Sequence, residues 1–331
     1  MAIIESGNYV GGRFQIKPAS VQRTVEKCRP WKGATAHMNI WNEYILATSM
    51  DEAGQSLQKA KGSTKFVAGG TDLLLEIQQN RHSPVETLVD VSQIPELRKM
   101  EIRGEYFFLG AGVPVSQIAT SELVKTHASA VATATGLIGG PQVRNSATLG
   151  GNVAHALPAA DGMIALVAMD AIAVIYCQGN LFEKPILELF RGAGVTALGV
   201  ADVLVGFKIR LIQKNEASAF DRVMRPQGVA LPILNTAVWL RRDENTIADI
   251  RIVFGPSGPV PSRALMVEST LRGNVLDAKA LSAAKAAIHD TVKFRTSKMR
   301  ATAEYRYQLA EVLLESVLNT AWNCAEERKN D

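Results

Sequence analysis

The 331-residue sequence has few cysteines and no long apolar run. Its three cysteines, Cys28, Cys177 and Cys324, are too few and too scattered for a disulfide framework, which favours a reducing cytoplasm. An iron–sulfur cluster usually takes four cysteine thiolates, so we expect none in this chain. No apolar run approaches the ~18 residues of a membrane span, and the N-terminus lacks the apolar core of a secretory signal.

Outside the N-terminus the chain has no excess of either charge. The net charge is +4, and residues 1–40 hold six Lys or Arg against two Glu, which leaves 30 basic and 30 acidic residues elsewhere. Nucleic-acid binding needs a basic face with interleaved aromatics, and none is visible, so we expect no nucleic-acid partner. The basic N-terminal extension is weakly compatible with a transit segment. It fits better an arm lying against a neighbouring domain or subunit.

The chain becomes regular after Ile40. Ser49-Met-Asp-Glu52 is typical of a capping box, which predicts a helix from there to about Lys61. The further predicted strands are 65–67, 87–91, 106–109, 171–176, 203–211, 233–240 and 247–254. The further predicted helices are 72–79, 115–123, 128–137, 159–169, 263–271, 278–290 and 302–325. The last helix is predicted to bury a stripe of apolar residues: Tyr305, Leu309, Val312, Leu313 and Val317.

A first glycine motif, Val67-Ala-Gly-Gly-Thr-Asp-Leu73, stands where a predicted strand meets a predicted helix. Two adjacent glycines permit positive φ and leave successive backbone N–H groups open toward an anion. A helix that follows such a turn adds a favourable dipole. The spacing matches neither GxGxxG nor a P-loop, so a plain tight turn is the alternative.

A second glycine-rich loop runs from Gly139 to Asp161 and contains small residues, amides and one arginine. Such a stretch suits close approach by a large planar or multi-phosphate ligand. The alternative is structural, with Asp161 capping a helix and Asn152 closing a turn. His155 is a tempting base, but no neighbour completes a nucleophilic triad and the histidines lack metal-ligand spacing. We therefore predict no catalytic residue and no metal site.

Together the two motifs resemble the FAD-binding medium subunit of the xanthine dehydrogenase family of molybdenum hydroxylases, which includes carbon monoxide dehydrogenase flavoproteins. The family's AGGTDL corresponds to residues 68–73, and its PQxRNxATxGGNxxxxxPxxD to residues 141–161. Residues 255–273 and 303–306 resemble signatures of the family's C-terminal domain, and Arg225 lies near a recurrent basic position. The N-terminal 40 residues have no counterpart in the family pattern.

The resemblance implies an α+β chain with a vanillyl-alcohol-oxidase-type FAD-binding fold, made of two α/β subdomains and followed by a small α+β domain. The expected parts are a basic N-terminal extension (1–40), FAD-binding subdomain 1 (41–92), FAD-binding subdomain 2 (93–215) and a C-terminal flavoprotein domain (216–331).

The resemblance also implies which residues hold FAD. A pyrophosphate-binding turn would comprise Val67, Ala68, Gly69, Gly70, Thr71, Asp72 and Leu73. The ribityl and phosphate path would be lined by Thr148, Gly150, Gly151, Asn152 and Ala154. Ile138 would lie against the adenine, Asp161 would hydrogen-bond toward the nucleotide end, and Leu204 would pack near the cofactor. Leu157 stands where many relatives have serine.

By the same resemblance the chain is an electron-transfer flavoprotein subunit in the cytoplasm. A large subunit would carry molybdopterin and a small one the [2Fe-2S] clusters, assembled as a dimer of heterotrimers, with electrons leaving FAD for an external acceptor. One alternative is a self-contained FAD-dependent oxidase or dehydrogenase of a small organic substrate. Another is an assembly subunit that has lost its flavin, which the intact glycine motifs argue against. No motif identifies the substrate or the acceptor.

Overall fold

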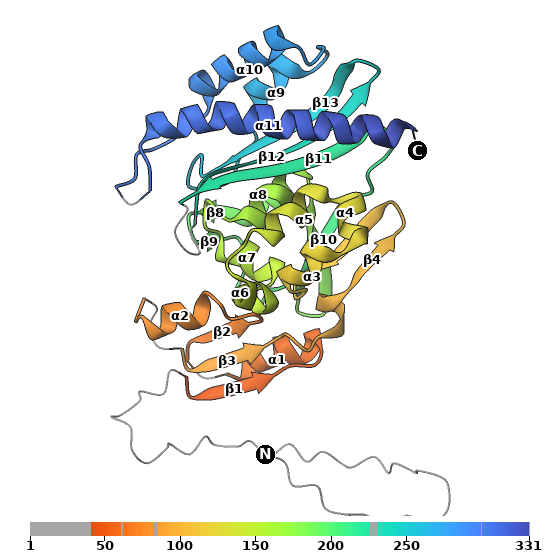
Figure 1. The fold of residues 1–331 in the computed structure, drawn as a ribbon. Helices are drawn as coiled ribbons and strands as arrows, with labels where there is room; N and C mark the ends of the chain where they lie inside the picture. Colours follow the sequence, from red (N-terminus) through yellow and green to blue (C-terminus); the bar gives the residue numbers. More distant parts are fainter. Residues whose placement is uncertain (1–40, 61, 82–84, 226–230, 299, 331) are drawn as a thin grey trace, which may run out of the picture. The chain divides into compact units, whose positions relative to one another are not determined.

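The computed structural model describes residues 41–60, 62–81, 85–225, 231–298 and 300–330 (Figure 1), so the predicted N-terminal extension and Cys28 lie outside it. The strands are β1 (Glu43–Leu46), β2 (Thr64–Val67), β3 (Thr87–Asp90), β4 (Met100–Arg103), β5 (Tyr106–Gly110), β6 (Ile172–Cys177), β7 (Asn180–Pro185), β8 (Phe190–Gly192), β9 (Val195–Thr196), β10 (Val203–Arg210), β11 (Glu216–Met224), β12 (Pro232–Asp243) and β13 (Thr246–Gly255). The α-helices are α1 (Met50–Lys59), α2 (Leu73–Gln78), α3 (Val115–Thr120), α4 (Glu122–His127), α5 (Ser129–Gly136), α6 (Pro141–Ser146), α7 (Leu149–His155), α8 (Asp161–Ala168), α9 (Leu265–Leu271), α10 (Ala278–Thr291) and α11 (Ala303–Asn330). Two 3₁₀ helices are η1 (Pro95–Arg98) and η2 (Ile186–Leu189).

The first sheet is parallel, with strand order β1-β3-β2. Strands β2 and β3 pair directly, with Thr64 opposite Thr87, and α2 connects them, which confirms the predicted β-α-β unit. Strand β1 was not predicted from the sequence, and it pairs with β3 on the other side. The carboxyl end of β2 therefore opens directly into the first glycine motif.

Helix α1 begins close to the position that the capping box predicts. The Glu52 N–H donates to Ser49 Oγ at 3.1 Å, as expected of a capping residue. The return bond differs from the motif, because Glu52 Oε2 accepts from the N–H and the hydroxyl of Thr48, both at 2.8 Å. The helix start is therefore closed one residue earlier than the motif implies.

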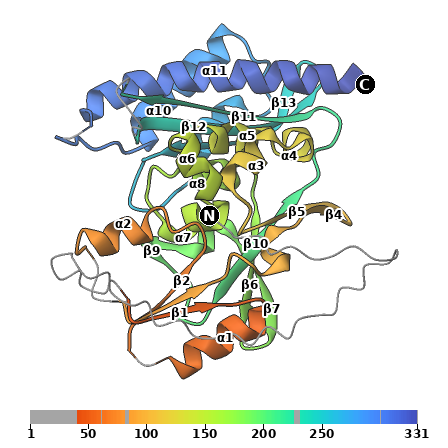
Figure 2. The same cartoon turned by 60° about the horizontal axis from the view of Figure 1, so that its bottom comes forward.

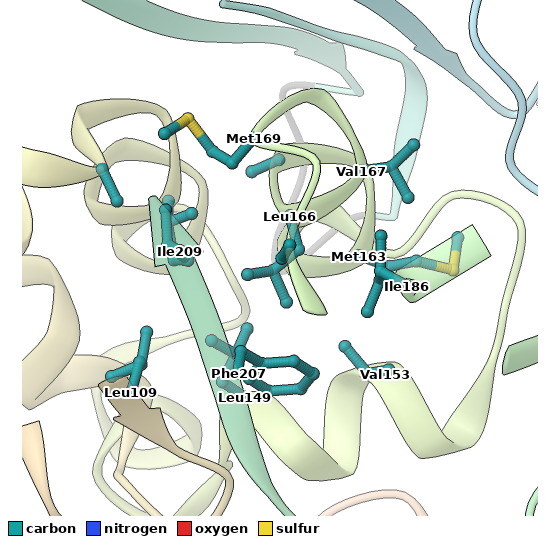
Figure 3. Close-up of a cluster of buried hydrophobic side chains, with 14 of the residues drawn as sticks. Leu109, Leu149, Val153, Met163, Leu166, Val167, Met169, Ile186, Phe207 and Ile209 are labelled. Atoms are coloured by element: carbon teal, nitrogen blue, oxygen red, sulfur yellow. The ribbon is translucent and has the colours of Figure 1, made fainter. Parts of the chain in front are cut away.

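The second sheet is antiparallel, with strand order β4-β5-β10-β6-β7. Every residue of α8 is buried, so this short helix forms the centre of the core beside the sheet. Figure 3 shows Phe207 and Ile209 of β10 directed toward α8, with Leu149 and Val153 of α7 closing the cluster. The sheet thus holds α7 in a fixed position through apolar packing.

The second glycine-rich stretch was predicted as a loop, and that prediction is wrong: it forms two short helices, α6 and α7. Pro141 starts α6, where its missing N–H costs nothing. Thr148 caps α7 by accepting from the Gly151 N–H at 3.1 Å. Glycine lowers helix propensity, but close packing of α7 against the rest of the protein outweighs that cost.

A third sheet, antiparallel with order β11-β12-β13, supports the C-terminal helices. Helix α11 contacts β11 and β12, while α5 and α8 contact the same sheet (Figure 1). The sheet is therefore enclosed between α11 and the helices of the preceding part. Strand β11 was not predicted from the sequence.

The predicted stripe of α11 is wrong at two of its five positions. Tyr305 is 44% exposed and Val312 is 64% exposed, whereas Leu313 and Val317 are buried as predicted. The buried face is completed by other residues of the helix: Arg306, Ala310, Leu314, Leu318, Ala321 and Ala325. A spacing of three and four residues fits more than one face of a helix, and the adjoining sheet selects among them.

The predicted domain boundaries stay a prediction. Two apolar clusters contain residues from both sides of such a boundary. One apolar cluster joins Val89 of the first sheet, and Ala47 just after β1, to Phe108 and Val174 of the second sheet. The largest cluster of described residues extends from Phe107 in β5 to Val253 in β13. Among the described residues, no helix is long and apolar enough to cross a membrane.

Candidate cofactor site

The first glycine motif forms a half-buried turn between β2 and α2. Gly70 has φ +67°, the left-handed conformation that glycine adopts without strain. In the described part of the chain, none of the successive N–H groups of residues 69–72 donates a hydrogen bond to the protein. Unused neighbouring N–H groups in such a turn form an anion-binding concavity. The predicted phosphate-binding turn thus has the donors that it needs.

The N–H groups at the start of α7, in contrast, are already used. Leu149 donates to the carbonyl of Val113 at 3.4 Å and Gly150 to that of Ala111 at 2.8 Å, while Gly151 donates to Thr148 Oγ1. These N–H groups are therefore not available to a phosphate. The second motif therefore differs from the first in what it can offer a ligand.

Gly150 and Gly151 face opposite ways. A Cβ on Gly150 would lie 2.5 Å from Ala111 Cβ, so this glycine permits α7 to pack against the end of β5. Gly151 is exposed, and a Cβ there would meet only Thr148 Oγ1, at 3.1 Å. Ala154, three residues further along, is exposed as well, so α7 presents small side chains on its open face.

Tertiary structure brings the two glycine motifs together. A Cβ on Gly69 would lie 2.1 Å from the carbonyl oxygen of Ser146, at the junction between α6 and α7. Figures 1 and 2 show α2 beside α6 and α7. The turn that has free N–H donors therefore lies against the segment whose helix presents the small side chains.

His155 connects the same two segments. Its Nε2 lies 3.0 Å from Glu76 Oε1, and its Nδ1 lies 3.6 Å from Asp72 Oδ2, both residues belonging to the α2 region. The imidazole is thus held between two carboxylates. His155 therefore links α7 to α2. The spacing of the residues in the sequence did not reveal this contact.

Asp161 is 4% exposed at the start of α8, and both of its oxygens have protein partners. Arg222 Nη1 donates at 2.5 Å and Asn235 Nδ2 at 2.7 Å. Burial raises the pKa of Asp161, while the ion pair with Arg222 and the bond from Asn235 act in the opposite direction. Asp161 joins α8 to the C-terminal sheet.

Sequence reasoning missed Arg222 and Asn235. The basic position that it singled out, Arg225, is exposed, whereas the Arg222 side chain is 7% exposed and also donates to the carbonyl of Leu137. Strand β11 places Arg222 opposite Asn235 of β12. Strand β11 also contains Glu216, Ser218 and Asp221, so no local pattern distinguished Arg222.

The remaining predicted residues are spread around this region. Ile138 is half-buried, and its carbonyl accepts from Arg144 Nη1 at 3.2 Å, which accounts for the arginine of the motif. Asn152 uses its Oδ1 to accept from the Met163 N–H at 3.1 Å, so it supports the start of α8. Leu204 is buried within β10. In the described residues there is no group of three or more His, Cys, Asp or Glu side chains able to hold a metal ion.

The fold and the site define a class of protein: a parallel β-α-β unit whose glycine turn can hold a phosphate-bearing cofactor, joined to a helix-covered antiparallel sheet. Residues 37–209 match the family described as the FAD binding domain in molybdopterin dehydrogenase, and residues 218–321 match the CO dehydrogenase flavoprotein C-terminal domain. The chain belongs to this family of FAD-binding subunits of molybdenum hydroxylases, and it is an oxidoreductase subunit whose cofactor is FAD.

Individual relatives agree with this assignment. The carbon monoxide dehydrogenase medium chain of Hydrogenophaga pseudoflava is 30% identical over 86% of this chain and 98% of its own length. A putative xanthine dehydrogenase FAD-binding subunit of Escherichia coli is 27% identical over 78% of this chain and 88% of its own length. A solved structure of the Hydrogenophaga enzyme superposes with a TM-score of 0.80 and 28% identity, covering 85% of this chain and 97% of that one. The predicted fold class is confirmed.

Proposed function

We propose that this chain is the electron-transfer subunit of a molybdopterin-dependent hydroxylase or dehydrogenase. It receives electrons from [2Fe-2S] clusters of a small subunit and passes them through FAD to an external acceptor. A large subunit with molybdopterin performs the hydroxylation. The names of the relatives, which are medium chains and FAD-binding subunits, support this division of labour.

The observation that carries the cofactor assignment is the unused run of N–H groups at residues 69–72. We assign the FAD pyrophosphate to this turn, with Val67, Ala68 and Leu73 setting its ends. Backbone donors suit the chain, because neutral amides bind the phosphates without an adjoining lysine cluster. Thr71 adds a hydroxyl donor beside them.

The second segment has a different part in the proposal. The exposed small residues of α7, Gly151 and Ala154, give a flat surface along which the cofactor can approach the backbone closely. Thr148 and Asn152 fix that surface by capping α7 and supporting α8. Gly150 sets the depth at which α7 packs.

Three of the predicted residues lie outside the segments 67–73 and 148–154. We propose that Ile138 lies beside the adenine and that Leu204 packs near the cofactor. For Asp161, whose oxygens are held by Arg222 and Asn235, we propose that it acts by positioning α8 and, through Asn152, the exposed face of α7. Bound FAD supplies the redox chemistry, and these residues supply binding, orientation and electrostatics.

The same proposal covers assembly and location. It places the chain in the cytoplasm, in a dimer of heterotrimers, and it leaves substrate choice to the large subunit. For the electron acceptor we propose only its chemical class: an external oxidant that reaches the flavin.

The exposed face of α7 can be tested with a single substitution. Gly151→Val should leave the fold intact, since a Cβ there meets no backbone, but should weaken FAD binding at least tenfold by blocking close approach. Gly54→Val in α1 is the matched control, because a Cβ there meets only Tyr176, at 3.9 Å. Flavin fluorescence titration of the apoprotein measures both. An unchanged affinity in Gly151→Val would refute this assignment.

The division of labour predicts what the isolated chain can do. Purified alone, it should bind FAD stoichiometrically and accept electrons from dithionite, yet it should show no hydroxylase turnover with purine, aldehyde or aromatic substrates. Co-expression with the molybdopterin and iron–sulfur chains should restore turnover. Substrate oxidation by the isolated flavoprotein would favour the self-contained oxidase instead.

A further inference from the structure

A basic patch lies in the C-terminal part of a chain whose body is otherwise neutral. Residues 291–306 contain five cations and a single acid, Glu304. The five cations are Lys293, Arg295, Lys298, Arg300 and Arg306. Within the described residues none of the five forms an ion pair, although most other buried or half-buried arginines of the chain do.

Arg306 is the unusual member of this patch. It is 2% exposed, and its Nε is enclosed without any hydrogen-bond partner. No described residue accepts from its two Nη groups either, and of the three nitrogens only Nε is fully enclosed. A largely buried charge without a partner is unfavourable, so the open edge of the guanidinium favours a counter-ion.

The local structure holds the neighbouring cations next to Arg306. The Ala303 N–H at the start of α11 donates to Thr296 Oγ1 at 3.0 Å, which ties the segment after Arg295 to the helix. The Ser297 N–H donates to the Ala301 carbonyl at 2.9 Å, so the chain doubles back and carries Arg300 toward the same helix end. The N-terminus of this 28-residue helix adds positive potential.

The electrostatics agree with this geometry. Burial lowers the pKa of Arg306, and the positive charges of Arg300 and Arg295 lower it further. Elsewhere the chain neutralises arginines of this kind: Arg222 has Asp161, and Arg263 has Glu268. Among the residues that the structure describes, no acid forms an ion pair with the patch around Arg306.

A groove with both polar and apolar walls adjoins the patch. It has a volume of about 380 Å³, and Lys293, Arg263 and three hydroxyl side chains line it. Leu265 and Met266, which are 63% and 57% exposed, form part of its apolar wall. A free inorganic anion would use the arginines alone and leave this groove unused. A protein segment with an acidic side chain and an apolar neighbour would use both.

We propose that three residues of the patch, Arg295, Arg300 and Arg306, bind an aspartate or glutamate of a partner subunit. An adjacent apolar side chain of that subunit would lie in the groove. The proposal rests on the proposed function, since it requires the molybdopterin or iron–sulfur chain as partner. The guanidinium fork of arginine matches a carboxylate in a bidentate manner, which gives the contact both strength and orientation.

Zero-length carbodiimide crosslinking of the purified complex tests the contact directly. Lys293 and Lys298 lie in the same segment as the arginines, and their amines would be joined to carboxylates of the partner. We expect peptides that link Lys293 or Lys298 to an acidic residue of another subunit. Links only within this chain, or only to a second copy of it, would overturn the proposal.

Substitutions provide the second readout. Arg295→Gln with Arg300→Gln should weaken association with the partner chains at least tenfold, measured by biolayer interferometry, with FAD content unchanged. Arg191→Gln with Lys214→Gln, which changes the net charge equally at exposed positions elsewhere, should have no effect. If the wild-type chain fails to associate, the proposed function is wrong. If it associates and the double variant does so equally well, only this inference is wrong.

Arg306→Met separates a binding role from a structural one. Methionine keeps the aliphatic packing and removes an unpaired buried charge, so the isolated chain should melt at a higher temperature. The same variant should associate more weakly with the partner chains. A lower melting temperature together with unchanged association would show that Arg306 is structural and would overturn its part in the site.

Discussion

Replacing Glu268 by leucine should lower the free energy of unfolding by about 3 kcal/mol. Glu268 is fully buried on α9, where it accepts from the Ile252 N–H at 2.9 Å and from Arg263 Nη2 at 2.6 Å. Leucine would leave both donors without an acceptor, and each unsatisfied buried group adds its desolvation cost. Urea denaturation followed by tryptophan fluorescence measures the change.

Two further variants make the result specific. Glu183→Leu removes a carboxylate paired with Lys208 at 2.8 Å, but Glu183 is about half exposed and should cost less than ~1 kcal/mol. Replacing Arg263 as well as Glu268 by leucine should recover part of the loss, because the uncompensated charge is then removed too. Equal losses for Glu268→Leu and Glu183→Leu would contradict the assigned role of burial.

Gly69→Ala should weaken FAD binding at least a hundredfold, equivalent to about 2.7 kcal/mol. The added Cβ would lie 2.1 Å from the Ser146 carbonyl oxygen and 2.9 Å from Ala147 Cα. Both are backbone atoms, so the clash cannot be relieved by a rotamer change, and the turn must separate from the α6–α7 junction. That movement displaces the N–H groups proposed to hold the pyrophosphate.

The control for this variant is Gly136→Ala, at the end of α5. A Cβ there would lie 3.5 Å from Ala119 Cβ, an ordinary contact, and alanine is the better helix former. We expect normal FAD content in Gly136→Ala and apoprotein in Gly69→Ala, both measured by flavin absorbance after purification. A Gly69→Ala protein that retained full flavin would show that the two segments need not touch.

Most of the regular structure could be predicted from local patterns. The capping residue Ser49, the β-α-β unit and the long C-terminal helix all follow from signals within a few residues, such as hydroxyl capping and apolar periodicity. Strands β1, β4, β7, β8, β9 and β11 were not predicted. The glycines of the second motif suggested a loop because glycine disfavours helix in isolation, whereas tertiary packing stabilises α7.

The residues proposed for the site came from the sequence, whereas the different parts proposed for the two glycine motifs depend on the folded structure. The two glycine motifs have similar composition, yet the N–H groups of residues 69–72 are unused while those of residues 149–151 are bonded to the protein. Which donors are free depends on contacts with Val113 and Ala111, far away in sequence. The same holds for Asp161, whose partners Arg222 and Asn235 belong to the C-terminal sheet.

The sequence by itself determined the family, the cofactor and many of the helices and strands, because glycine motifs and apolar periodicity are local properties of the chain. Its scarcity of cysteine likewise predicted that the clusters belong to another chain. Only the tertiary structure decided that Gly69 lies against Ser146, that Asp161 pairs with Arg222 and that Arg306 is buried without an ion pair to any described acid. The physical reason is that burial and the pairing of polar groups depend on residues distant in the chain, which only the folded protein brings into contact.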